Sequence, residues 1–108
     1  MTDYNVLVVC AAGMSSSLLE NNTREAAQAH GHRLAIHALS VGEIAGYDFN
    51  RTPVDMVLIA PQVRYKKKNI TQMAAPYGVV VQDIEPVTFG MVDGEKLFEQ
   101  IVTAIVKE

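Results

Sequence analysis

The sequence has a single cysteine, a shortage of basic residues and no long apolar segment. One cysteine cannot close a disulfide within the chain, and no apolar run approaches the ~20 residues that cross a bilayer. The beginning, "MTDYN", lacks the basic stretch and apolar core of a signal peptide. The net charge of −3 argues against a nucleic-acid partner, which would favour a basic face. We therefore expect a cytoplasmic protein that binds no nucleic acid and does not insert into a membrane.

The composition is that of one folded domain covering residues 1–108. Hydrophobic residues make up 49% of the chain and charged residues 19%, without any low-complexity tract. A chain of this length can bury a core without metal ions or disulfides. The same numbers argue against disorder.

Short apolar runs alternate with amphipathic segments along the chain. The runs predict strands at residues 5–10, 33–39, 55–61 and 78–84. The segments with helical spacing predict helices at residues 16–30, 64–75 and 93–107, with Asp93 as the N-cap of the last. Residues 40–49 contain glycines and predict at most a single helical turn.

This order predicts an α/β fold with a four-stranded, doubly wound parallel sheet and helices on both faces. In such sheets ligands bind beyond the carboxyl ends of the strands, where the strand order reverses. Cys10 is the last residue of the first predicted strand. We therefore expect it to lie at the ligand-binding edge.

The residues that follow Cys10 are small or carry hydroxyl groups. Small side chains and a glycine allow successive backbone N–H groups to surround an anion, and the next helix adds its positive dipole end. The same field favours thiolate over thiol, which makes the sulfur nucleophilic. The predicted phosphate-binding residues are Ala11, Ala12, Gly13, Met14, Ser15, Ser16 and Ser17.

Other interpretations of this segment stay open. A lone cysteine at a strand end is often an inert apolar residue, and the serines could serve only as a helix cap. The placement of the loop resembles that of low-molecular-weight tyrosine phosphatases, Cys-x5-Arg-Ser/Thr after the first strand. Ser16 occupies the arginine position, so the bidentate clamp of phosphate-ester cleavage is missing. A small phosphatase and a redox-sensing thiol protein remain the alternatives.

Three segments together resemble a known family. They are "VCAAGMSSSLL" at 9–19, "VLIAPQVRY" at 57–65 and "FGMVDGEKLFEQIV" at 89–102. The sequence is similar to the enzyme IIB subunits of the lactose/cellobiose/chitobiose class of the bacterial phosphoenolpyruvate-dependent sugar phosphotransferase system. The element Cys-x-x-Gly-Met-Ser-x-Ser-Leu-Leu is the most specific of the matching features.

The resemblance implies a phosphotransferase without a cofactor. Cys10 would accept a phosphoryl group from a phosphohistidine of enzyme IIA and pass it to a sugar held by the membrane subunit, enzyme IIC. The family suggests a β-linked disaccharide such as cellobiose, chitobiose or lactose. Gln62 and Tyr65 follow the third strand and are expected to border the phosphate loop. The alternative is that Gln62 only begins a turn and Tyr65 only packs.

The remaining charged residues receive weaker predictions. His30 and His32 have no third metal ligand nearby in the sequence, so a helix end that favours positive charge is expected instead of a metal site. Nothing marks His37, on the second strand, as reactive. The lysines at 66–68 are expected to form a solvated helix face, with a docking contact for an acidic patch of a partner as the alternative. Asp83 and Glu85 are expected to serve a turn after the fourth strand, with an approach to the site edge as the alternative.

Overall fold

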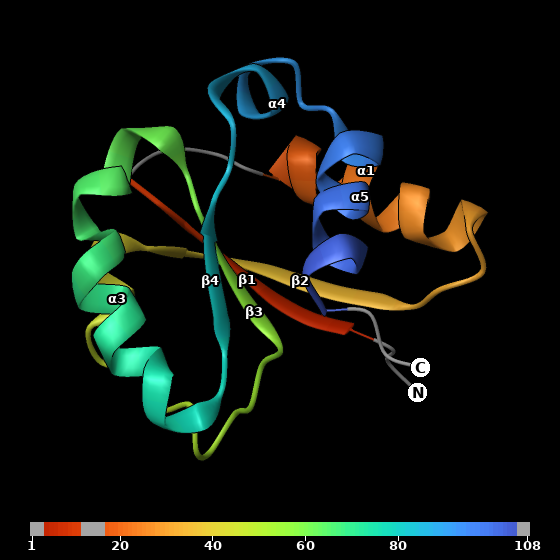
Figure 1. Cartoon of the computed structure of the whole chain (residues 1–108). Helices are drawn as coiled ribbons and strands as arrows, with labels where there is room; N and C mark the ends of the chain where they lie inside the picture. Colours follow the sequence, from red (N-terminus) through yellow and green to blue (C-terminus); the bar gives the residue numbers. More distant parts are fainter. Residues whose placement is uncertain (1–3, 12–16, 106–108) are drawn as a thin grey trace.

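Four parallel strands form one sheet in the order β2-β1-β3-β4 (Figure 1). The computed structural model describes residues 4–11 and 17–105. Continuous runs of valine, leucine and isoleucine favour strands that are buried on both faces. The strands are β1 (Tyr4–Cys10), β2 (Leu34–Ser40), β3 (Met56–Ile59) and β4 (Val80–Asp83). The predicted sheet is confirmed.

Helices cover both faces of this sheet (Figure 1). One face is covered by α1 (Ser17–Ala29) and α5 (Gly94–Ile105). The other is covered by α2 (Val41–Ile44), the 3-10 helix η1 (Pro61–Lys66) and α3 (Lys67–Ala74). A second 3-10 helix, η2 (Ala75–Tyr77), precedes β4, and α4 (Pro86–Gly90) follows it at the carboxyl end. In the part of the chain that the structure describes, no helix combines the length and the apolar character that a membrane span needs.

The central strand β1 divides the core into two layers. Val6 and Val8 face α1 and α5, whereas Leu7 and Val9 face α2 and α3. All four side chains are buried, as the alternation of side chains along a strand requires. The buried sheet therefore fixes the positions of the residues at the ends of its strands.

The strand order reverses between β1 and β3. From β1 the chain crosses first to β2 on one side and then to β3 on the other. The β1–β3 boundary is thus the topological switch point, where ligands bind in sheets of this class. Ala60 follows the end of β3 there and donates its N–H to the carbonyl of Val9 (2.9 Å).

The structure differs from the expected elements at two places. The helix predicted at 64–75 begins as α-helix only at Lys67 and is preceded by η1, because Pro61 fixes the backbone immediately after β3. The segment between β4 and α5 contains α4, which was not predicted. Five residues beginning with Pro86 are too few to show a helical apolar period. Asp93 is confirmed as the cap of α5, since its Oδ1 accepts from the N–H of Lys96 (3.0 Å).

Candidate functional site

Cys10 is the last residue of β1 and lies at the switch point. It pairs with Ser40, the last residue of β2, while Ala60 follows β3 on its other side. Three strand ends therefore meet around this position. Cys10 thus lies at the carboxyl edge of the sheet, as expected.

The thiol of Cys10 is buried in this arrangement. The residue is 4% exposed and belongs to the core layer facing α2 and α3. Its Sγ lies 3.6 Å from the backbone oxygen of Leu39, a distance that suits a weak S–H···O hydrogen bond. A carbonyl acceptor of this kind favours the protonated thiol.

The chain reaches α1 directly after the predicted phosphate loop. Ala11 is half-buried, and α1 begins at Ser17. The loop residues Ala12, Gly13, Met14, Ser15 and Ser16 lie outside the described residues. The residues on either side of the loop are the end of a strand and the start of a helix, and the N–H groups at a helix start favour anions.

Gln62 and Tyr65 both lie in η1, next to the end of β3. Val63 between them is buried and fixes η1 against the sheet, whereas Gln62 faces solvent. Tyr65 is 72% exposed. The alternative that Tyr65 packs into the core is therefore wrong. An exposed tyrosine at this edge offers an aromatic face and a hydroxyl group to a partner.

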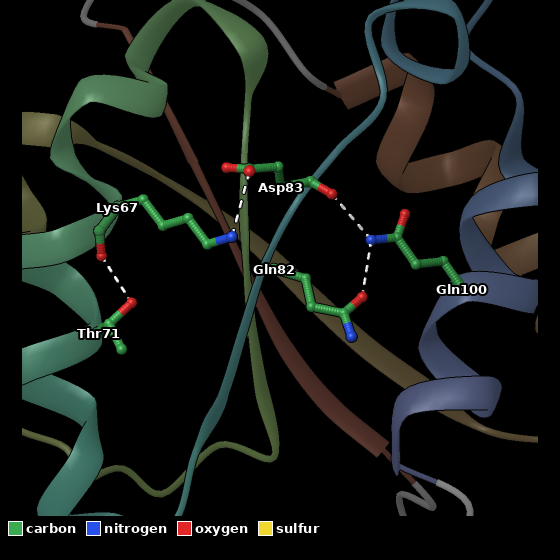
Figure 2. Close-up of polar contacts among 5 residues, drawn as sticks. All are labelled: Lys67, Thr71, Gln82, Asp83 and Gln100. Atoms are coloured by element: carbon green, nitrogen blue, oxygen red, sulfur yellow. Dashed lines mark hydrogen bonds and ion pairs between the residues drawn. The ribbon is translucent and has the colours of Figure 1, made fainter.

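An ion pair at the end of β4 was missed by the sequence interpretation. The Lys67 ammonium lies 3.2 Å from Asp83 Oδ2, and Figure 2 shows it reaching from α3 across to the strand. Lys67 is thus not simply part of a solvated lysine face, and Asp83 belongs to β4 instead of a turn. The other oxygen, Oδ1, is buried and has no hydrogen-bond partner among the described residues.

The same strand end is tied to α5 by an amide side chain. Gln100 Nε2 donates to Gln82 Oε1 (3.0 Å) and to the backbone oxygen of Asp83 (2.9 Å), as Figure 2 shows. Both hydrogen atoms of this amide group are therefore used. The end of β4 is held from both faces of the sheet, by Lys67 on one and Gln100 on the other. Neighbouring Glu85 lies in the connection to α4, where it is 3.7 Å from the Lys96 ammonium.

A capping box fixes the end of β2 beside Cys10. Ser40 Oγ accepts from the N–H of Glu43 (3.2 Å), and Glu43 Oε1 accepts from the N–H of Ser40 (3.0 Å). The Ser40 backbone N–H and, to a lesser extent, the Ser40 hydroxyl group donate to the Glu43 carboxylate, and these hydrogen bonds lower the pKa of Glu43. The single turn expected within 40–49 is confirmed as α2, with Ser40 as its N-cap and Glu43 as the third residue of the capping box.

The histidines do not gather near Cys10. His30 lies just after α1, where its Nε2 is 3.1 Å from Glu95 Oε2 and its ring stacks on Phe98. His32 packs against the same phenylalanine, and His37 is an exposed residue of β2. Within 4–11 and 17–105, no three histidine, cysteine, aspartate or glutamate side chains form a group that could hold a metal ion.

A protein-family model matches residues 5–100, and its description is "PTS system, Lactose/Cellobiose specific IIB subunit". Curated relatives match over nearly their full length. The oligo-β-mannoside-specific EIIB component of Bacillus subtilis (strain 168) is 34% identical over 95% of this chain and 97% of the relative. The cellobiose-specific EIIB component of Lactococcus lactis subsp. lactis (strain IL1403) is 34% identical over 90% and 92%. The galactose-specific EIIB component of Lactococcus lactis subsp. cremoris (strain MG1363) is also 34% identical, over the same shares.

Solved structures agree in fold. The cellobiose-specific phosphotransferase IIB component of Borrelia burgdorferi superimposes with a TM-score of 0.71 at 30% identity, covering 94% of this chain and 91% of the other. The lactose-specific IIB component domain of Streptococcus pneumoniae gives a TM-score of 0.78 at 24% identity, covering 98% and 100%. The second comparison bears on the fold alone.

Proposed function

The chain belongs to the lactose/cellobiose-specific IIB subunits of the phosphotransferase system, and from this premise we propose that Cys10 is its phosphoryl carrier. The family expected from the three sequence motifs is confirmed, and the protein is a phosphotransferase. The observation that carries the proposal is the position of Cys10. The only cysteine of the chain ends β1 at the switch point, and the chain then runs through a glycine- and serine-containing loop into α1.

The proposed reaction consists of two displacements at phosphorus. In the first, the Cys10 thiolate attacks the phosphohistidine of enzyme IIA. The S–P bond forms, the P–N bond breaks, and the imidazole leaves with its electron pair. In the second, a sugar hydroxyl oxygen attacks the phosphocysteine, the P–O bond forms, and the thiolate leaves as the hydroxyl proton is released. Such transfers depend chiefly on positioning and on stabilisation of charge.

The phosphate would be held by neutral donors. The residues proposed to bind it are Ala11, Ala12, Gly13, Met14, Ser15, Ser16 and Ser17, through backbone N–H groups and hydroxyls. A carrier must keep its phosphate from water until the acceptor arrives. A loop with serine where a phosphatase has arginine suits a carrier, because it lacks the clamp that stabilises charge during hydrolysis.

Gln62 and Tyr65 are proposed to contact the partners and not the sugar. Both face solvent from η1, beside the strand end that adjoins Val9. Donor and acceptor must each reach the same sulfur, so the partner surface includes the rim around Cys10. The proposed partners are enzyme IIA and the membrane enzyme IIC, and the proposed acceptor is a β-linked disaccharide. The relatives' names include oligo-β-mannoside, cellobiose and galactose at equal identity, so the similarity favours no single sugar.

Three incubations test the proposal. The protein is mixed with phosphorylated enzyme IIA, with an aryl phosphate, or with dilute peroxide, and each product is analysed by mass. We expect a phosphoryl group only after the first incubation, and its transfer to sugar when vesicles that contain enzyme IIC are added. Turnover of the aryl phosphate would instead identify a phosphatase. Rapid oxidation of Cys10 at low peroxide concentration, without labelling by enzyme IIA, would identify a redox sensor.

A further inference from the structure

A strained turn joins α4 to α5. Val92 has a φ of +46°, in the left-handed region that β-branched residues rarely adopt. Its N–H donates to the carbonyl of Phe89 (3.2 Å), and the N–H of Asp93 donates to the carbonyl of Thr88 (3.0 Å). This pair of bonds is the Schellman motif, with valine at the position that is usually glycine. Strain of this kind persists only where surrounding contacts hold it.

The contact that reaches this turn comes from α1. Asn22 Nδ2 donates to the backbone oxygen of Val92 (2.9 Å), across 70 residues of sequence. Two residues later, Gly94 brings the start of α5 against the α1 backbone. A Cβ at Gly94 would lie 2.2 Å from the carbonyl carbon of Asn22 and 2.5 Å from the nitrogen of Thr23. The turn and the second turn of α1 therefore meet backbone to backbone.

These contacts act on the helix that begins after the Cys10 loop. Asn22 is five residues beyond Ser17, so it lies ~7.5 Å along the axis from the start of α1. Buried Leu19 and Ala26 determine which face of α1 meets the core. Apolar contacts are non-directional, so they specify the axial position of a helix less sharply than a directed hydrogen bond does. A directed hydrogen bond and a backbone contact fix the axial position as well.

We propose that Asn22 is a positioning residue of the Cys10 site. By holding the carbonyl of Val92, it fixes α1 against α5 and thereby the N–H groups with which α1 begins. Those groups are the donors that the proposed phosphoryl transfer requires at the loop. The inference rests on the proposed function of Cys10. It adds a specific residue, hydrogen-bonded to a turn 70 residues away in the sequence, that keeps the donors in register with the sulfur.

Two substitutions that add the same charge one residue apart provide the test. Asn22→Asp replaces the donor by an acceptor facing the Val92 carbonyl. Asn21→Asp adds the charge on the exposed side of α1 and keeps the acceptor for Arg24, which lies 2.7 Å from Asn21 Oδ1. Both variants are phosphorylated by enzyme IIA over a range of concentrations. We expect Asn22→Asp to lower the maximal rate by about tenfold or more, with little change in the half-saturating concentration. Asn21→Asp should match the wild type.

A second measurement separates positioning from stability and needs no partner protein. The rate of Cys10 alkylation is followed against pH, well below the melting temperature of each variant. Displaced donors stabilise the thiolate less, so we expect the inflection to move to higher pH in Asn22→Asp but not in Asn21→Asp. Asn22→Ala, which adds no charge, should shift the inflection to higher pH as well. This variant replaces Asn22→Asp in the test if Asn22→Asp does not fold.

The outcomes distinguish the two proposals. If the wild type accepts phosphate and both aspartate variants transfer and titrate alike, Asn22 has only a structural role and the inference is wrong. A lower melting temperature in Asn22→Asp without a change in rate or inflection leads to the same conclusion. If the wild type accepts no phosphoryl group from enzyme IIA, the proposed function is wrong, and the role of Asn22 in transfer is rejected with it.

Discussion

Replacing Gly94 by alanine should force α1 and α5 apart. The added Cβ would lie 2.2 Å from the carbonyl carbon of Asn22 and 2.3 Å from its oxygen, whereas carbon contacts are normally ~3.5 Å or more. Both atoms belong to a helix backbone, so the helices must separate by roughly 1 Å. Overpacking of this kind costs about 1–3 kcal/mol, and a better helix former returns at most about 1 kcal/mol. The separation also weakens dispersion along the buried faces of Leu97 and Ile101.

We therefore expect Gly94→Ala to lower the free energy of unfolding by about 2 kcal/mol, or the melting temperature by roughly 10 °C. Urea unfolding followed by circular dichroism measures the change. Gly90→Ala is the matched control, because a Cβ at Gly90, in α4, meets nothing within 4 Å. That variant should be neutral or more stable by up to about 1 kcal/mol. If both variants unfold at the same urea concentration, the close contact between α1 and α5 is refuted.

Three further substitutions test separate parts of the structure. Ser16→Arg should shorten the lifetime of the phosphorylated protein, because a guanidinium group stabilises the charge that develops during hydrolysis. An unchanged or longer lifetime would contradict this expectation. Asp83→Asn should lower the free energy of unfolding in urea by no more than about 1 kcal/mol, because the Lys67 and Asp83 side chains are 44% and 35% exposed. A decrease above about 3 kcal/mol would contradict this and indicate a buried ion pair. Glu43→Gln should lower the melting temperature near neutral pH, where the wild-type carboxylate is ionised. The difference from wild type should vanish as the pH falls through the lowered pKa of Glu43, because the wild-type carboxylate is then protonated. A difference in melting temperature that does not depend on pH would exclude this carboxylate as the cause.

The sheet was predictable because its signals are local. Each strand is a short run of apolar, often β-branched residues, and the first ends directly at Cys10. Alternation with helical segments then restricts the topology to a parallel, doubly wound sheet. The position of Cys10 at the switch point follows from these two facts. Gln62 could be placed at the same edge because Pro61 ends the preceding apolar run.

The contacts that hold the carboxyl end of the sheet were not predictable from the sequence. Asp83 and Lys67 are 16 residues apart, and nothing in either segment indicates that the two side chains meet. The contact of Asn22 with Val92 spans 70 residues. Its only local signal is the glycine at 94, and a glycine at the start of a helix is more simply read as part of a turn. Close approach of two helix backbones becomes visible only in three dimensions.

The central claim is that Cys10 carries the phosphoryl group. The most direct measurement is the intact mass of the protein after incubation with phosphorylated enzyme IIA, compared with that of Cys10→Ser, followed by peptide mapping. Because the exchange of sulfur for oxygen is nearly isosteric, both proteins should give the same circular dichroism spectrum. We expect one phosphoryl group on Cys10 in the wild type and none held stably by the serine variant. A phosphoryl group that persists in Cys10→Ser, on His30, His32 or His37, would contradict the claim.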